Sequence, residues 1–225
     1  MTCPRTPATT ARMIRHLALA LFAAGPAAAH PHMFVTATVE VRIDDDGLLL
    51  GVGVIWAYDE FFSLLVTEEL GIDPDGDLVL TPAETEALRV YLEWPADFEG
   101  DMYLSSNDTP LPLAPLAEHE VSFTDAVVQE AFYRPLATPQ DTVFAPVDVR
   151  IYDPFYYVAY EIVPAVVVTG RGGCVATLVK PDLLAANKLV DELLPGRAAS
   201  DVGPDEQFPE VGLAFSDTIR VACGG

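Results

Sequence analysis

An acidic loop near the middle of the chain has the residue types and the spacing of a calcium site. Counted from Asp73, carboxylates occupy positions 1, 3 and 5 of a twelve-residue stretch, with a threonine hydroxyl at position 9 and a glutamate at position 12. Calcium takes about six to eight oxygen ligands, and the backbone carbonyl of position 7 supplies one in EF-hand loops. The pattern therefore predicts an EF-hand-like calcium site. Its ligand residues are Asp73, Asp75, Asp77, Val79, Thr81 and Glu84.

One position of this loop departs from the EF-hand scheme. Position 6, where a sharp turn favours glycine, holds Leu78, and the glycine stands two residues earlier as Gly76. A non-glycine residue in the left-handed conformation costs roughly 1 to 2 kcal/mol, which would lower calcium affinity about tenfold or more. Extracellular calcium would still fill such a site. A helix-capping box, Thr81–Glu84, explains those residues without an ion, but it leaves the three aspartates unexplained.

Histidines form a second group of candidate ligands. If an export signal is cleaved after Ala29, His30 becomes the N-terminal residue and His32 follows it closely. The free amine and the two imidazoles would then suit nickel, cobalt, zinc or copper. Pro31 has no amide hydrogen, which excludes the planar copper clamp but not a brace through the amine and side chains. His119 is a candidate to complete the shell. The alternative is that histidines on a frayed terminus are inert.

The first 29 residues have the organisation of a cleavable signal peptide. Three arginines precede an apolar run from Leu17 to Ala24, and three alanines end the segment at Ala29. The run is too short for a membrane span, which needs roughly 20 apolar residues, and no later segment qualifies. We therefore expect residues 1–29 to be removed and residues 30–225 to form one periplasmic domain without membrane insertion.

Charge, cysteine content and missing motifs narrow the function classes. The chain has 12 basic and 34 acidic residues, and its net charge of -22 disfavours nucleic acid and anionic membranes as partners. Cys174 and Cys223 remain after signal removal, and one disulfide between them is the simplest interpretation, with two buried free thiols as the alternative. No Ser-His-Asp set, Walker loop or dinucleotide loop is evident, so we expect a protein that is not an enzyme.

The apolar pattern predicts the elements that must position these groups. Alternating residues indicate an α+β fold that is mostly an antiparallel, sandwich-like β-sheet, beginning with a hairpin over Met33–Ile43 and Leu48–Trp56. Residues 58–94 change to helical spacing and predict an inserted EF-hand-like helix-loop-helix with Asp59 as N-cap. One C-terminal helix is expected from the cap Asp182 to Leu194. Further expected strands are 121–123, 127–133, 147–152, 155–162, 165–169, 174–179 and 215–223.

Several segments occur in a combination that is found in a known family. They are the His30-Pro31-His32 start, Trp56–Phe62, the Asp-rich loop, Tyr152–Pro154 and the ending Asp217–Cys223. Together they resemble a bacterial family of unknown function that is usually described as the periplasmic component of an uncharacterised ABC-type transport system. The resemblance covers nearly the whole mature chain. Because members are often encoded beside nickel/cobalt-type transport proteins, it implies metal traffic and a membrane transporter or permease as partner, but no established activity.

Three hypotheses of different classes follow. The leading one is a non-enzymatic periplasmic accessory protein of a membrane transport system, which binds a transition metal at His30 and His32 while calcium at Asp73–Glu84 orders the fold. The alternative is a calcium-stabilised secreted module for protein–protein interaction with no transition-metal role. A copper-dependent oxidative enzyme using the N-terminal brace is a third and weaker hypothesis.

Overall fold

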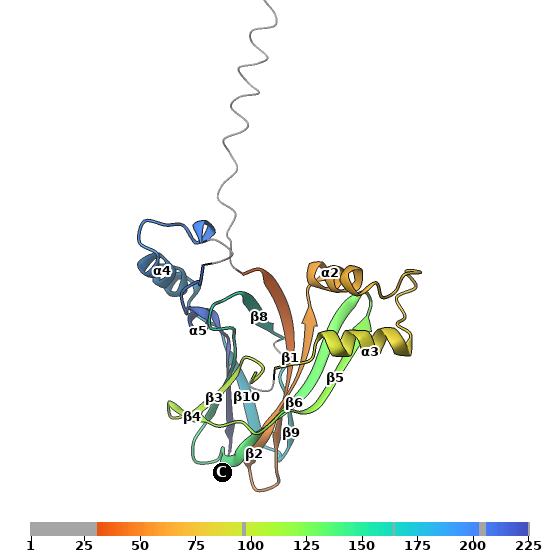
Figure 1. Cartoon of the computed structure of the whole chain (residues 1–225). Coiled ribbons are helices and arrows are strands. Elements are labelled where there is room, and N and C mark those ends of the chain that lie inside the picture. Colours follow the sequence, from red (N-terminus) through yellow and green to blue (C-terminus); the bar gives the residue numbers. More distant parts are fainter. Residues whose placement is uncertain (1–30, 96–97, 164, 203–205, 225) are drawn as a thin grey trace, which may run out of the picture.

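The computed structural model describes residues 31–95, 98–163, 165–202 and 206–224 (Figure 1). The predicted signal peptide and His30 lie outside these residues. In the described part, two β-sheets pack face to face, and buried side chains from both sheets form one apolar core. Figure 1 shows helices α2 and α3 on one side of this sandwich and α4 on the other. The predicted α+β class with mainly antiparallel strands is confirmed.

The larger sheet has the strand order β5-β6-β2-β1-β8, and β9 also pairs with β1. The predicted first hairpin is confirmed as β1 and β2, and the Asp44 carboxylate accepts hydrogen bonds from the backbone N–H groups of Asp46 and Leu48 in its turn. Both β8 and β9 run parallel to β1, each beside a different half of it, so the sheet is not purely antiparallel. The strands are β1 (Met33–Ile43), β2 (Leu48–Tyr58), β5 (Ala117–Thr124), β6 (Val127–Asp141), β8 (Val158–Ile162) and β9 (Val167–Gly170).

The smaller sheet has the order β10-β11-β7-β3-β4. Its first hairpin, β3 with β4, was not among the expected strands, although Asn107 and Asp108 form a two-residue turn of a favoured type with φ values of 47° and 60°. Because β3 and β4 are only five and three residues long, their alternation is too brief to stand out in the sequence. The strands are β3 (Met102–Ser106), β4 (Thr109–Leu111), β7 (Val147–Ile151), β10 (Cys174–Val179) and β11 (Thr218–Cys223).

Capping residues set where the longer helices begin. Asp59 precedes α2 (Glu60–Leu70) and accepts a hydrogen bond from the Phe62 backbone. Thr81 precedes α3 (Pro82–Tyr91) in a capping box, and Asp182 precedes α4 (Leu183–Leu193). All three predicted caps are therefore present.

The helical segments differ from expectation mainly at their ends. Helix α3 stops at Tyr91, and Trp94 does not extend the helix but packs against the core through Trp56 and Phe132 of the larger sheet. Phe215, expected as the first residue of the last strand, instead ends the short helix α5 (Gly212–Phe215), and that strand begins at Thr218. Ala199–Asp201 form a single 3-10 turn. The buried residues of α2 are Ser63 and Val66. The Ser63 hydroxyl accepts a hydrogen bond from the Val128 backbone N–H of β6, which attaches the helix to the larger sheet.

Candidate functional site

The acidic loop connects two helices whose inner faces are fixed by a small apolar cluster. Val66 of α2, Ile72 at the start of the loop and Leu88 of α3 pack together with Val128 of β6. All four side chains are at most 5% exposed. This cluster holds both ends of the loop against the larger sheet. The loop itself projects from the sandwich and faces solvent.

The three aspartates of the loop come together at its surface. Asp73, Asp75 and Asp77 each offer a carboxylate oxygen, and these oxygens all lie within 4.8 Å of one another. The Asp73 carboxylate accepts the backbone N–H of Leu78 at 3.2 and 3.3 Å, and the Asp77 carboxylate accepts that of Val79 at 2.8 Å. The loop therefore folds its own N–H groups onto its carboxylates. Oxygen donors of this kind fit a hard divalent cation such as calcium.

Leu78, at position 6 of the loop, has a left-handed backbone conformation. Its φ of 63° lies in the left-handed region, where an EF-hand loop favours glycine at this position. Its side chain is 46% exposed, so its size meets no obstacle in the loop. Gly76 also has a positive φ, 69°, which matches its displaced position in the sequence. The cost at Leu78 is therefore one of backbone strain alone.

Glu84 stands near the same group but is engaged in capping α3. One of its oxygens accepts both the backbone N–H and the hydroxyl of Thr81 at 2.7 Å, and the other accepts the Asp73 backbone N–H at 3.2 Å. These bonds, the Thr81 backbone N–H first among them, hold the pKa of Glu84 below its usual value. Glu84 thus links the first residue of the loop to the first turn of α3, while Val79 and its carbonyl lie in an exposed stretch.

His32 and His119 occupy different surroundings. The His32 ring stacks on Tyr157 with 4.7 Å between ring centroids, and His32 lines a surface pocket together with Tyr58 and Asp59. His119, on β5, places its Nε2 atom 2.6 Å from the carboxylate of Glu130 on β6. His30, the third predicted ligand, lies outside the described residues.

Glu130 is the residue that connects these surroundings. Its side chain is 1% exposed, and its carboxylate accepts hydrogen bonds from the Tyr58 hydroxyl and, at 2.8 Å, from Trp94 Nε1, besides its contact with His119. Burial and the charge of Glu130 raise the pKa of Tyr58 well above its usual value, which keeps this phenol a hydrogen-bond donor. Tyr58 therefore links the pocket of His32 to His119 through Glu130.

Sequence reasoning missed Glu130, yet the strand pattern contained a signal. Alternate residues of β6 are buried, and Glu130 falls at a buried position between Val128 and Phe132. A carboxylate at such a position must be hydrogen-bonded, so a charge in the apolar register of a strand marks a polar network.

The chain matches one model of a known protein family. The match runs over residues 16–223 and is to the family described as "Protein of unknown function (DUF1007)". The chain belongs to this family. No curated protein matches it. The description of the DUF1007 family assigns no activity, so a function for this member must be argued from its own geometry.

The predicted disulfide of this DUF1007 chain is present. Cys174 of β10 and Cys223 of β11 are bonded, and they are also directly opposite each other in the antiparallel pairing of the two strands. Cys223 is 8% exposed, and its sulfur lies 2.9 Å from the Thr142 hydroxyl. Within the described ranges, no helix combines the length and the apolar character that crossing a membrane requires.

Proposed function

We propose that this DUF1007 protein is an exported calcium-binding accessory protein of a membrane transport system. One observation carries the calcium assignment, namely that carboxylate oxygens of Asp73, Asp75 and Asp77 lie within 4.8 Å of one another in a loop where Leu78 has a left-handed backbone conformation. Three carboxylates at this distance repel one another, and a divalent cation between them relieves that repulsion. The signal-peptide pattern of residues 1–29 supports export to a compartment where calcium is abundant.

The bound ion would order the two helices relative to each other. Asp73 stands two residues after Gly71, the C-cap of α2, and Glu84 lies in the first turn of α3, so a cation held by both joins the two helices at the loop. Glu84 already contacts the Asp73 backbone, which places this second carboxylate close to the first ligand. The role for calcium is therefore structural: it fixes a helical surface outside the sandwich that a membrane partner can recognise.

Calcium binding is tested by calorimetric titration of the protein purified after export. The double substitution Asp75→Asn and Asp77→Asn removes two ligand charges, and we expect calcium affinity to fall at least about tenfold, together with loss of the rise in melting temperature that calcium produces. The matched control is Asp45→Asn with Asp46→Asn, in the exposed turn between β1 and β2. Equal loss in both variants, or no binding to the unsubstituted protein at millimolar calcium, contradicts the proposal.

Glu84→Gln separates ion binding from helix capping. Glutamine keeps the capping box because its amide oxygen still accepts the Thr81 N–H, but it lacks the second carboxylate oxygen that calcium would use. We expect weaker calcium binding, while the calcium-free protein loses only the hydrogen bond from the Asp73 N–H. Unchanged calcium affinity in this variant would show that Glu84 acts only as a cap.

A second candidate function is transition-metal binding at the N-terminal histidines. The observation that favours it is the chain of contacts from the pocket of His32 through Tyr58 and Glu130 to His119. In this proposal His30 and His32 bind a nickel, cobalt, zinc or copper ion for delivery to the transporter, and His119 belongs to the same site.

Titration with nickel or zinc chloride tests the histidine site. Replacing His30 and His32 by alanine should abolish binding, whereas His119→Gln reports separately on the third predicted ligand. Unchanged affinity in the variant without His30 and His32 removes the transition-metal role. In that case the protein stands as a calcium-stabilised interaction module.

A further inference from the structure

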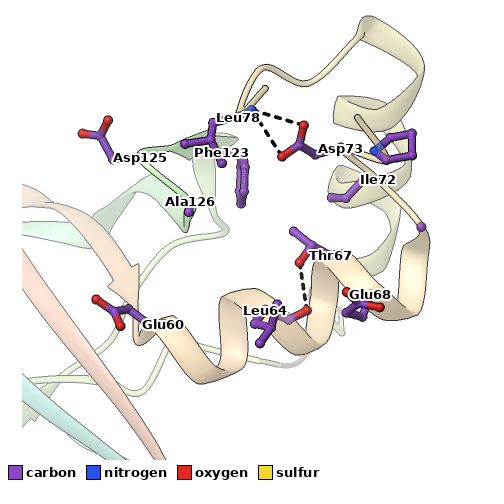
Figure 2. Close-up of a pocket in the computed structure, with 12 residues that line it drawn as sticks. Glu60, Leu64, Thr67, Glu68, Ile72, Asp73, Leu78, Phe123, Asp125 and Ala126 are labelled. Atoms are coloured by element: carbon purple, nitrogen blue, oxygen red, sulfur yellow. Dashed lines mark hydrogen bonds between the residues drawn. The ribbon is translucent and has the colours of Figure 1, made fainter. Parts of the chain in front are cut away.

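A groove of about 620 Å³ lies beside the acidic loop (Figure 2). Helix α2 forms one side, the start of the loop forms a second, and the turn between β5 and β6 forms the third. Figure 2 shows the ring of Phe123 standing between the turn and the loop, opposite α2. The apolar residues of its lining are Leu64, Ile72, Pro74, Leu78, Phe123 and Ala126.

The apolar surface continues from the groove along the outer face of α2. Phe61, Leu64 and Leu65 follow helical spacing, and their side chains are 67%, 57% and 49% exposed. The opposite face of the helix already packs on the sheet through Val66, so these three residues make a second apolar stripe. A contiguous exposed apolar surface of this kind marks an interaction site.

Every charged residue that lines the groove is acidic. Glu60 and Glu68 stand on α2, Asp73 on the loop and Asp125 on the β5–β6 turn, and the lining contains no lysine or arginine. The chain as a whole carries a net charge of -22. A second copy of this chain or a nucleic acid would bring more negative charge and be repelled, whereas a basic partner would be attracted.

Two turns place apolar side chains on the groove wall. Asp125 and Ala126 form the two-residue turn between β5 and β6, and their φ values of 53° and 64° are typical of such a hairpin turn. Leu78 in the acidic loop also has a positive φ, 63°. Ala126 and Leu78 both line the groove with apolar side chains, where glycine, which adopts these conformations more readily, would leave none.

We propose that this groove binds a cationic amphipathic segment of a partner protein. An apolar side chain of that segment packs against Leu64 and Phe123, and its lysine or arginine groups face Glu60, Glu68 and Asp125. This inference deepens the proposed function by naming the chemistry of the partner, and it rests on that function only in sharing Asp73 and Leu78 with the calcium loop. Asp73 is left to the ion, and the other three carboxylates meet the peptide.

The test uses a labelled model peptide of about 18 residues with leucine on one helical face and lysine on the other, titrated in about 0.15 M salt to limit long-range attraction. The groove variant carries Leu64→Ala and Glu68→Gln. The matched control carries Leu184→Ala and Glu192→Gln on α4, which removes the same atoms and charge at exposed sites on the other side of the sandwich. We expect at least about tenfold weaker binding in the groove variant and less than about twofold change in the control.

A second peptide, with every leucine replaced by serine, separates docking from simple charge attraction. It should bind at least about tenfold more weakly than the leucine peptide. The proposal is overturned if both peptides bind equally, if both protein variants lose affinity equally, or if the leucine peptide does not bind.

A different variant tests the calcium proposal separately from the docking proposal. Asp75 and Asp77 do not line the groove. The Asp75→Asn, Asp77→Asn protein therefore loses two of the proposed calcium ligands while keeping every residue of the groove lining. If the peptide binds the Asp75→Asn, Asp77→Asn protein but not the groove variant, the docking surface is supported even if no calcium binds. If calcium binds the unsubstituted protein but the peptide does not, only the docking proposal is refuted.

Discussion

His119 and Glu130 face each other across two neighbouring strands, with His119 Nε2 2.6 Å from a Glu130 oxygen. The carboxylate is 1% exposed and also accepts hydrogen bonds from Tyr58 and Trp94. No lysine or arginine contacts it among the described residues. Glu130 is thus held by hydrogen bonds to three other segments of the chain, which makes this network a point where the fold is sensitive to substitution.

Replacing Glu130 by alanine should be strongly destabilising. The change leaves the Tyr58 hydroxyl, the Trp94 N–H and the His119 ring without their acceptor, and we expect the free energy of unfolding to fall by about 3 to 5 kcal/mol. Urea denaturation measures this loss. Glu120→Ala, on the exposed face of β5, is the control and should change stability by less than about 0.5 kcal/mol. A similar small effect at both positions would show that the network does not hold the sheet together.

Asp101 makes stability depend on pH. Burial raises its pKa to about 6, against the lowering effect of the hydrogen bond from Tyr160. Because the folded-state pKa lies above the ordinary value, the folded state binds the proton more tightly. The contribution of this group to stability is therefore greatest below about pH 4 and falls as the pH rises to about 6.

The substitution Asp101→Asn isolates this effect. Asparagine can still accept the Tyr160 hydroxyl and has no charge to bury, so the variant should be more stable than the unsubstituted protein at pH 7.5, by up to about 3 kcal/mol. The advantage should shrink toward zero as the pH falls to 4. Denaturation at a series of pH values checks this, with the exposed Asp108→Asn as control. A gain that is independent of pH would exclude titration of Asp101 as its cause.

Backbone strain in the acidic loop should lower the stability of the folded protein. Leu78 already has a φ of 63° before any ion binds, so Leu78→Gly should raise the free energy of unfolding by up to about 1 kcal/mol. Gly76→Ala makes the opposite change at φ of 69°, where an added Cβ would meet no atom within 4 Å, so only strain is introduced. It should lower the free energy of unfolding by about 1 kcal/mol. Urea denaturation of both variants tests the pair, and shifts in the same direction would refute the role of strain.

Local patterns predicted the elements of this fold better than they predicted its pairings. The caps Asp59, Thr81 and Asp182 act within three residues of themselves, so their signals survive in the sequence. The parallel pairing of β8 with β1 joins residues more than a hundred positions apart, such as Met33 and Val158. The alternation of apolar and polar residues within one strand does not indicate which strand pairs with it. The order of the strands in each sheet was therefore not predicted from the sequence.

The same distinction between local and long-range signals applies to the candidate site. The aspartates at 73, 75 and 77 were found because a loop of consecutive residues contains all of them, and the structure brings them together. The partners of Glu130 stand 72, 36 and 11 residues away. Only the tertiary fold assembles such a network, and the sequence could show no more than a charge in an apolar register.

The disulfide should stabilise the fold mainly by lowering the conformational entropy of the unfolded chain. Cys174 and Cys223 are 49 residues apart, and closing a loop of that length is worth about 4 kcal/mol in the loop-entropy model. Replacing both by serine should lower the free energy of unfolding by about that amount. Under conditions where the serine variant is folded, amide exchange in β10 and β11 should still be slow, because the backbone pairing of these strands remains. A reducing agent should destabilise the unsubstituted protein equally and leave the serine variant unchanged. A loss below about 1 kcal/mol in urea denaturation would mean that β10 and β11 remain associated in the unfolded chain without the bond.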